Sequence, residues 1–508
     1  MKLNYKRTLF VGFAFFLICL FWQTYDTIVP KILTDKFGLS QTVSGIVMAF
    51  DNVLALFLLP LFGALSDKSR SRHGKRTPFI VIGTLVAAVL LVSLSIADNA
   101  QLKKIEEVSK VDDPAALSIL YEASDDLSLD FDGKDLKELF TEEEFTAIRS
   151  DDKSSDDYTT YVVPTRQAYA RRATSSSATP FLVFVILLFF LLIAMGTFRS
   201  PAVALMPDVT PKPLRSKANA IINLMGAIGG IVVLGLGIVF GTGKTQNALM
   251  SYTTFFGVVA AIMVLCLVIF VWKVKEPKFV AECEAISREN GLTEEKEEAA
   301  TQEKRRLTTA ELRSLVLILA SVVLWFMGYN AVTSKYSVYA GSVLDLDYNT
   351  TLIVAQAAAI LSYIPIGIVS SKIGRKKTIL AGIIFLATAF FVASFMRAGS
   401  SPLVMNVLFA LAGIGWATIS VNSYPMVVEL ATGSNVGRYT GFYYTASMAA
   451  QTLTPILSGF LMDKISLTAL FPYATLFVAL AFLTMLFVKH GDSKPLPKKE
   501  LLEQLDVD

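Results

Sequence analysis

Long apolar runs alternate with short polar segments along most of the chain. Twelve runs have the length of a membrane-spanning helix, which needs about 20 mostly apolar residues. They lie at approximately 8–29, 43–66, 78–97, 180–207, 218–240, 252–273, 314–333, 350–370, 378–396, 402–428, 439–461 and 467–488. The first run is too long for a cleaved signal peptide, and we expect it to be retained. The pattern predicts an all-α polytopic membrane protein with twelve transmembrane helices.

Composition agrees with lipid as the surrounding solvent. Of the 508 residues, 53% are hydrophobic and 18% are charged, whereas a soluble domain usually carries about 25% charged residues. The two histidines lie in a polar loop and in the tail, and the three cysteines are scattered. The sequence therefore predicts no disulfide framework, no metal site and no enzyme. It contains no P-loop motif, so ATP is not the expected energy source.

The short polar segments predict the orientation. Basic residues gather at the N-terminus, in GALSDKSRSRHGKRTPF at 63–79, at 212–217, at 372–377 and in the tail. Since these segments fall on one side of the alternating helices, the positive-inside rule places both termini in the cytoplasm. We expect a multi-pass protein of the plasma membrane. Topology explains the basic cluster at 63–79, and no soluble domain surrounds it, so no nucleic-acid partner is expected.

Two hydrophilic stretches interrupt the helices. Residues 98–179 hold 19 Asp and Glu against 10 Lys and Arg, and form an external acidic insertion between helices three and four. Within it we expect short helices at 101–110 and 134–148, and disorder at 150–157 and 174–179. An EF-hand is excluded, because placing Gly133 at loop position six puts Ser128 and Leu139 at the end-ligand positions.

The second stretch, 275–313, is expected to be a cytoplasmic linker between two six-helix bundles. The expected units are 1–97 with 180–274 as the N-terminal bundle, 98–179 as the insertion, 275–313 as the linker, 314–489 as the C-terminal bundle and 490–508 as a cytoplasmic tail.

An internal repeat relates the two bundles. A shift of 304 residues places Tyr25 on Tyr329, Asp26 on Asn330, Lys31 on Lys335, Asn52 on Gln356, Gly63 on Gly367 and Ser66 on Ser370. After a four-residue gap, GKRT at 74–77 meets GRKKT at 374–378. Parallel halves with a site at their interface near the bilayer midplane are typical of secondary transporters, which work by alternating access.

The loop motifs carry a family resemblance. Residues 63–76 resemble the loop between helices two and three of the major facilitator superfamily, G-x-L-x-D followed by a basic segment. Within that superfamily, SDKSRSRHGKRTPF is similar to the form R-x-R-x-G-R-R-x-P-F of sucrose transporters, proton-associated sugar transporters and the wider glycoside–pentoside–hexuronide:cation symporters. ALMPDVTPKPLRSKAN at 204–219 is similar to the same group's segment between helices four and five. The narrower resemblance implies proton-coupled symport of a neutral sugar, such as a disaccharide or glucoside.

One difference from that group bears on the coupling ion. Melibiose-type permeases carry two helix-two aspartates one turn apart, the lower next to a proline. Here Pro60 remains, but Leu59 and Ala55 occupy the carboxylate positions. The sodium site of those permeases is therefore not carried over, which favours a proton. Sodium and uncoupled transport stay open.

Charged residues within the helices are the first functional candidates, because a charge near the bilayer centre costs at least ~2.5–3.5 kcal/mol. Asp51, inside helix two, is the expected coupling or substrate-binding acid, with a structural hydrogen bond as the alternative. Asp26, near the outer end of helix one, is the second candidate acid. Arg199 either binds substrate or anchors a helix C-terminus, and its depth argues against direct pairing with Asp51.

Uncharged polar and aromatic residues in the helices supply the materials of a sugar site. Some of them are expected to act as interhelix contacts instead. The full set of substrate-binding candidates is Gln23, Tyr25, Asn52, Arg199, Trp325, Tyr329, Asn330, Gln356, Trp416, Asn422, Tyr443, Tyr444 and Gln451.

A cytoplasmic gate is predicted around Asp67, whose carboxylate lies at the C-terminal end of helix two and needs a compensating charge. We expect a latch between the halves that breaks and re-forms during transport, with a solvated topology loop as the alternative. In the second half Ser371 replaces Asp67. The expected gate residues are Gly63, Asp67, Arg72, Gly74, Lys75, Arg76, Asp208, Arg215, Gly374, Arg375, Glu429 and Arg438.

Two other functions stay open at this point. One is export or uniport of another small solute by a major facilitator protein. The other is a non-transporting receptor or scaffold that binds a partner through the external insertion. We expect a monomer in the lipid bilayer, with a small solute as partner and no cofactor beyond the coupling ion.

Overall fold

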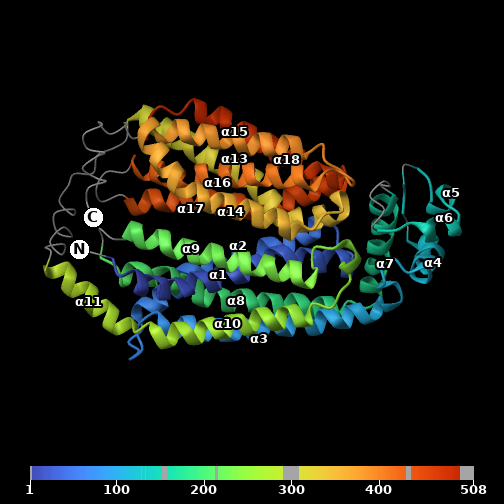
Figure 1. Cartoon of the computed structure of the whole chain (residues 1–508), viewed down its shortest axis with the longest axis horizontal. Coiled ribbons are helices and arrows are strands. Elements are labelled where there is room, and N and C mark those ends of the chain that lie inside the picture. Colours follow the sequence, from blue (N-terminus) through green and yellow to red (C-terminus); the bar gives the residue numbers. More distant parts are fainter. Residues whose placement is uncertain are drawn as a thin grey trace.

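The computed structural model describes residues 3–127, 129–131, 133–150, 157–211, 215–289, 308–430 and 436–491. Within them, long helices lie side by side in an elongated bundle, with a smaller helical unit at one end (Figure 1). The described parts of both terminal segments lie at the opposite end. This arrangement agrees with the prediction that the termini and the insertion fall on opposite sides of the membrane.

Twelve long helices of the described chain form the bundle. In the N-terminal half they are α1 (Tyr5–Lys31), α2 (Gln41–Lys68), α3 (Thr77–Lys104), α8 (Thr179–Asp208), α9 (Arg215–Phe240) and α10 (Thr253–Lys273). In the C-terminal half they are α13 (Thr309–Tyr339), α14 (Tyr348–Ile373), α15 (Arg375–Ala393), α16 (Pro402–Val428), α17 (Val436–Lys464) and α18 (Leu470–Leu486). Among the described residues, ten helices are apolar and long enough to cross a membrane. Helices α14 and α17 have 26 and 29 residues and complete the C-terminal half.

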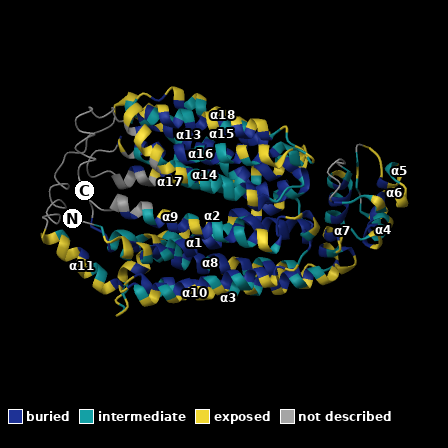
Figure 2. Cartoon of the chain, in the orientation of Figure 1, coloured by how far each residue is buried: buried dark blue, intermediate teal, exposed yellow. Residues whose placement is uncertain are grey.

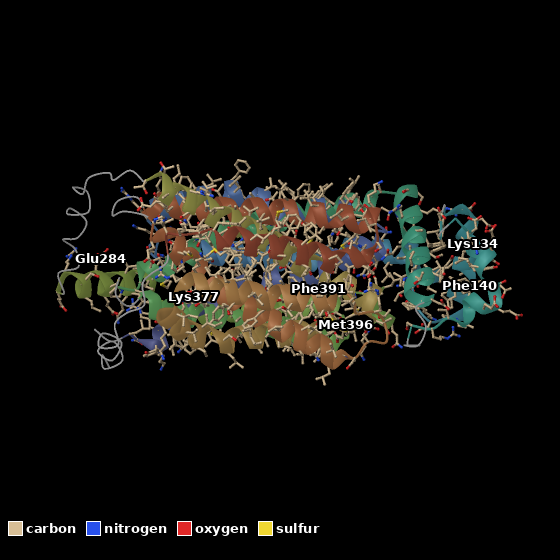
Figure 3. The ribbon with its side chains drawn as sticks, turned by 90° about the horizontal axis from the view of Figure 1, so that it is seen from above. Lys134, Phe140, Glu284, Lys377, Phe391 and Met396 are labelled. Carbon is tan, nitrogen blue, oxygen red and sulfur yellow. The ribbon has the colours of Figure 1, made fainter. Side chains whose placement is uncertain are left out.

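Each half has its own hydrophobic core, and buried residues gather inside each half (Figure 2). The repeat is visible in local geometry as well, because α1 and α13 both continue into a five-residue π-helical turn, η1 (Ile32–Lys36) and η7 (Ala340–Leu344). The flank of the bundle is apolar. Phe391 on α15 is 54% exposed, and it lies between Lys377 at the end near the termini and Met396 toward the insertion (Figure 3).

The two halves meet mainly along α2 with α17 and α9 with α14. Glycines allow the close approach of α2 and α17. A Cβ on Gly45 would lie 2.0 Å from the Pro455 carbonyl oxygen, and one on Gly459 would lie 2.2 Å from that of Gln41. The second contact lies at the end of the bundle that carries the insertion.

The insertion folds into α4 (Pro114–Ala123), α5 (Leu136–Leu139), α6 (Glu142–Ala147) and α7 (Val163–Ser176), the last preceded by the π-helical turn η4 (Tyr158–Val162). These elements share a separate hydrophobic core, which also includes Leu249 from the loop between α9 and α10. A short helix within 134–148 was predicted, whereas α4 and α7 were not.

Disorder at 174–179 was a wrong prediction. Helix α7 runs to Ser176 and α8 begins at Thr179, and the buried Thr174 donates a hydrogen bond of 2.9 Å to the Phe37 carbonyl. A Ser/Thr-rich composition does not reveal such a tertiary partner. Most of the other segment expected to be disordered, residues 151–156, lies outside the described residues.

Two predicted boundaries shift, and the linker holds an element that was not predicted. Helix α3 continues to Lys104, past the expected end at 97, because the buried Asp98 pairs with Lys36 at 2.6 Å. Helix α13 begins at Thr309, before the expected 314, with a capping box between Thr308 and Glu311. The expected linker contains a further helix, α11 (Glu276–Glu289).

Candidate functional site

Three charged side chains from three helices come together in the N-terminal half. Asp26 of α1, Asp51 of α2 and Arg199 of α8 lie close enough for their charges to interact. Each is only half-buried. The Arg199 guanidinium also lies over the Trp22 ring, 5.2 Å from its centroid. We refer to these three charged residues as the charged cluster.

The proximity of Arg199 to Asp51 was not expected. Counting residues from the helix ends put the two at different depths, but α8 has 30 residues and its inner end extends further than that of a minimal span. Asp51 also accepts a hydrogen bond of 2.7 Å from the Asn52 amide. From the opposite half, Tyr444 of α17 lies within electrostatic range of Arg199. The cluster therefore faces the interface between the halves.

Two glutamines connect the halves in the interior. The Gln356 amide of α14 donates a hydrogen bond of 2.6 Å to the Gln23 side-chain oxygen of α1. Both side chains are half-buried. Gly230 of α9 lies against the pair, since a Cβ there would be 2.9 Å from the Gln356 oxygen. Helices from both halves thus present amide groups at one place.

An aromatic platform lies in the C-terminal half. Tyr329 of α13 and Trp416 of α16 stack in parallel, with centroids 3.8 Å apart and planes 4° apart, and Phe326 packs edge-on against Trp416 at 5.1 Å. Tyr329 and Trp416 are half-buried. The amide nitrogen of the neighbouring Asn330 has no hydrogen-bond partner within the described part of the chain. The platform therefore combines a flat apolar surface with a nearby donor.

Four of the predicted substrate-binding residues are buried in the conformation described, and their contact with substrate stays a prediction. Tyr25, Trp325, Asn422 and Tyr443 are 2%, 0%, 2% and 8% exposed and lie in the cores. Their polar atoms either bond within the protein, as Tyr443 does with Ser423, or are buried, as in Trp325. Sequence alone could not separate these from cavity-facing residues, because both kinds are aromatic or small and polar. Gln451 is half-buried, and its amide donates to the Ser447 carbonyl of its own helix.

At the end near the termini, Arg76 is the centre of a polar cluster. It contacts Asp67 at 2.5 Å, Asp208 at 2.8 Å and the Ser66 hydroxyl at 2.5 Å. Burial lowers the pKa of Arg76, but Asp208 and Asp67 outweigh it, and the pKa is raised overall. The compensation expected for Asp67 is therefore present. These contacts lie within the N-terminal half, so the predicted latch between halves stays a prediction for another conformation.

The other expected gate residues surround this cluster or its counterpart. Arg72 and Lys75 are exposed, and Gly63 lies against Ser200. In the C-terminal half Arg375 pairs with Glu429. Gly74 and Gly374 have φ of +109° and +93°, which favours glycine at both repeat-related loops. The side chains of Arg215 and Arg438 lie outside the described ones.

The loop preceding α3 has a partner that the sequence did not reveal. Glu276 at the start of α11 accepts hydrogen bonds from the backbone N–H groups of Arg76 and Thr77, at 2.9 Å and 2.7 Å. It therefore caps the N-terminus of α3. Arg7 of α1 also binds α11, through Glu282 and the Phe279 carbonyl.

A second group of polar contacts was missed by sequence reasoning, at the end of the bundle with the insertion. Lys335 of α13 donates to the Gln41 carbonyl at 2.8 Å, and Asp463 of α17 accepts from the N–H groups of Gln41 and Thr42 at 2.7 Å. These contacts join the halves, and we refer to them as the outer latch. The repeat match of Lys31 with Lys335 was the available signal.

Lys31 corresponds to Lys335 in the repeat and lies at the other contact between the halves, where the end of α9 meets the start of α14. It donates to the Thr242 carbonyl at 3.0 Å and lies 5.5 Å from the Tyr348 ring centroid. The Thr242 hydroxyl in turn bonds Tyr348 at 2.8 Å and accepts from Asn349 at 3.2 Å. The outer end of the bundle is therefore closed by polar contacts on both seams. Within the described residues no group of His, Cys, Asp and Glu could hold a metal ion.

Comparison with known proteins identifies related sequences. The model of the Major Facilitator Superfamily matches residues 170–364 and 348–505, and that of the MFS/sugar transport proteins matches residues 10–102. YagG of Escherichia coli K12, described as a glycoside/cation symporter, is 34% identical over 71 residues. That match covers 14% of this chain and only 15% of YagG.

Solved structures share the whole architecture. An inward-open structure of the xylose transporter XylE from E. coli aligns over 99% of this chain and 100% of its own, with a TM-score of 0.60 and 15% identity. The nucleoside transporter NupG aligns over 96% of this chain and 100% of its own, with a TM-score of 0.54 and 14% identity. At these identities the likeness establishes the fold alone.

Proposed function

This chain belongs to the Major Facilitator Superfamily of membrane transporters, and from that premise we propose that it is a proton-coupled symporter of a neutral sugar. It works by alternating access of a site between the two halves. The end with the termini faces the cytoplasm, and the insertion faces outward. The protein is a transporter of a small solute rather than an enzyme.

The choice of a sugar rests on the chemistry at the interface. A sugar ring has apolar faces that stack on aromatic rings and hydroxyl groups that bond to amides. The Tyr329–Trp416 platform and the Gln23–Gln356 pair offer both. The match of residues 10–102 to sugar transport proteins and the short likeness to YagG support the same class.

The charged cluster is the single observation that carries the proton coupling. Two carboxylates and one guanidinium sum to one negative charge, so one bound proton makes the cluster neutral. A neutral cluster is much less costly to enclose away from water than a charged one. Occlusion of the loaded transporter therefore requires the proton, and return of the empty transporter follows its release. Asp51, which interacts electrostatically with Arg199 and accepts a hydrogen bond from Asn52, is the principal carrier, and Asp26 shares the proton with it.

Purified protein in liposomes with an internal pH indicator tests this proposal. We expect one or more neutral mono- or disaccharides, added outside, to acidify the interior. Asp51→Asn should abolish acidification, since the neutral amide mimics the protonated acid, while exchange of labelled sugar across the membrane persists. Asp125→Asn, in the insertion and away from the cluster, should behave as the native protein.

Other outcomes would overturn parts of the proposal separately. Sugar entry without acidification would leave a uniporter or a different coupling ion, which replacement of external sodium would reveal. Absence of a response to every sugar, with uptake of a nucleoside or efflux of a hydrophobic dye, would replace the substrate class. Acidification that persists in Asp51→Asn and Asp26→Asn would remove the cluster from the coupling step.

A further inference from the structure

The insertion is docked onto the outer end of α1 by a dense set of contacts. From α7, Arg171 donates to the Gly38 carbonyl at 3.0 Å and Gln167 donates to the Asp35 carboxylate at 3.0 Å. Gln101, near the end of α3, donates to the Lys36 carbonyl at 2.9 Å. These bonds cover the whole segment 35–38, and they join the bond from Thr174 described above. The insertion is therefore attached to the transporting bundle by more than its two chain connections.

The backbones also approach directly. Gly38 has a φ of +63°, and a Cβ there would lie 2.3 Å from the Arg171 nitrogen and the Gln167 carbonyl oxygen. Beneath this contact, Lys36 and Asp98 form an ion pair with both side chains fully buried. A buried pair of this kind is stable only in well-defined surroundings. Helix α7 and the end of α1 are thus joined by backbone contact as well as by side-chain hydrogen bonds.

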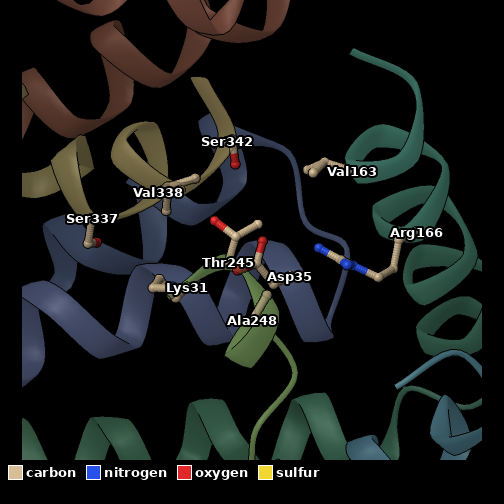
Figure 4. Close-up of a pocket in the computed structure, with 10 residues that line it drawn as sticks. Lys31, Asp35, Val163, Arg166, Thr245, Ala248, Ser337, Val338 and Ser342 are labelled. Carbon is tan, nitrogen blue, oxygen red and sulfur yellow. The ribbon is translucent and has the colours of Figure 1, made fainter. Parts of the chain in front are cut away.

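On its other side, α7 faces the C-terminal half across a small pocket (Figure 4). Val163 and Arg166 of α7 line one wall, Lys31 and Asp35 a second, and Thr245 and Ala248 of the α9–α10 loop a third. The remaining wall comes from the C-terminal half, by Ser337, Val338, Gly341 and Ser342. The space accommodates about one water molecule.

The polar groups in this pocket are buried but incompletely paired. Arg166 is 2% exposed and extends from α7 toward the pocket, where Asp35 lies (Figure 4). Its terminal nitrogen bonds the Tyr158 hydroxyl at 2.8 Å, whereas its Nε has no partner in the described part of the protein. The Ser337 hydroxyl, 2% exposed, is also unpartnered there. Such a seam opens at less cost than a fully bonded core.

We propose that helix α7 is an external clamp of the transport cycle. It travels with the N-terminal half and closes the outer seam against η7 and the end of α13, so that outward opening must separate it from the C-terminal half. The outer end of the bundle is then closed at three places, by the clamp, by the outer latch and by the contacts of Lys31 with Thr242 and Tyr348. By stabilising the outer-closed state, it sets how often the transporter faces outward.

Chemical modification of a buried position in the seam tests the clamp. Ser337→Cys places a thiol in the pocket that a membrane-impermeant maleimide reaches only when the seam opens. In Gln167→Ala/Arg171→Ala, two bonds that hold α7 are lost, and we expect the thiol to react roughly fivefold to 150-fold faster. The protein without Ser337→Cys gives the background from its native cysteines.

Arg172→Ala is the matched control, because Arg172 lies on the same helix but pairs with Asp126 at 3.0 Å within the exposed part of the insertion. Its reaction rate should equal that of the parent. Equal rates for the double variant and the control would overturn the proposal. Gln167→Ala alone, with a smaller expected increase, replaces the double variant if the latter fails to fold. The readout needs no transported solute, so it does not depend on the sugar proposal.

Discussion

Gln356 of α14 donates a hydrogen bond to Gln23 of α1 across the interface between the two halves. Gln356 occupies the repeat position of Asn52, which in the first half bonds Asp51 instead. The same position therefore serves the interface in one half and the charged cluster in the other. In the alternating-access cycle proposed above, the halves rock against each other, so the bond between the glutamines must break or be replaced by bonds to the solute.

Loss of the Gln356 amide should weaken solute binding. We expect Gln356→Ala to raise the KM of the transported sugar about twofold to twelvefold with little change in kcat, since one neutral hydrogen bond contributes about 0.5–1.5 kcal/mol. Uptake of labelled sugar into liposomes measures both constants. Gln451→Ala, whose amide bonds its own helix, is the control. A KM that stays unchanged would assign Gln356 to the interface alone.

Removal of the Arg199 charge should change the proton requirement. With Arg199→Gln the two carboxylates carry two negative charges, so the cluster becomes neutral only after binding two protons. Uptake should therefore fall at neutral pH, recover as the external pH is lowered, and depend more steeply on pH than in the native protein. Arg199→Lys, which keeps the charge, should retain the native pH profile. Identical profiles for Arg199→Gln and native protein would contradict the charge balance.

Substitution of Trp416 in the aromatic platform should weaken solute binding more than substitution of a tryptophan buried in the core. We expect Trp416→Ala to lower sugar affinity about twofold to twelvefold, because aromatic contacts contribute about 0.5–1.5 kcal/mol beyond their buried area. Trp416→Phe should retain most of the affinity. Trp325→Phe is the comparison, as that ring is fully buried in the core. Titration of tryptophan fluorescence with sugar measures the affinities, and equal values for Trp416→Ala and Trp325→Phe would argue against the platform.

The outer latch should weaken when either of its two charged partners is removed. Asp463→Ala removes a cap from α2, which costs about 0.5–2 kcal/mol, and should increase maleimide modification of Ser337→Cys. Lys335→Met keeps the length of the side chain but removes the hydrogen bond to the buried Gln41 carbonyl, so modification should become faster in this variant as well. Modification rates that stay at the parent value in both variants would contradict a latch.

In the polar cluster at the inner end, substitution of Arg76 should reduce folding stability more than substitution of either aspartate that it contacts. Asp67 is 62% exposed in its side chain, and we expect Asp67→Asn to cost at most about 1 kcal/mol of folding stability. Asp208→Asn should cost more, because that carboxylate is less exposed at 34%. Arg76→Ala should cost the most, since it leaves both carboxylates and the Ser66 hydroxyl unpaired. Thermal unfolding in detergent, with exposed Lys75→Ala as control, checks this order.

The amino-acid sequence by itself determined the class of the protein. Twelve apolar runs, too few charges for a soluble surface and a repeat at constant offset predict two six-helix halves, because lipid forces the chain to satisfy its backbone hydrogen bonds within helices. The sequence also identified Asp26, Asp51 and Arg199, since charges within apolar runs are rare and stand out.

Only the tertiary structure decided which residues meet. It brought Arg199 to the two aspartates, joined Gln23 to Gln356, and sent Tyr25, Trp325, Asn422 and Tyr443 into the cores. It also showed that the insertion, for which the sequence predicted short helices and disordered segments, has its own core and docks through Arg171 and Gln167. Such contacts depend on helix rotation, tilt and packing, which join residues far apart in the chain. A local hydrophobic pattern reports how each segment meets its solvent, and carries no information on which neighbour it will face.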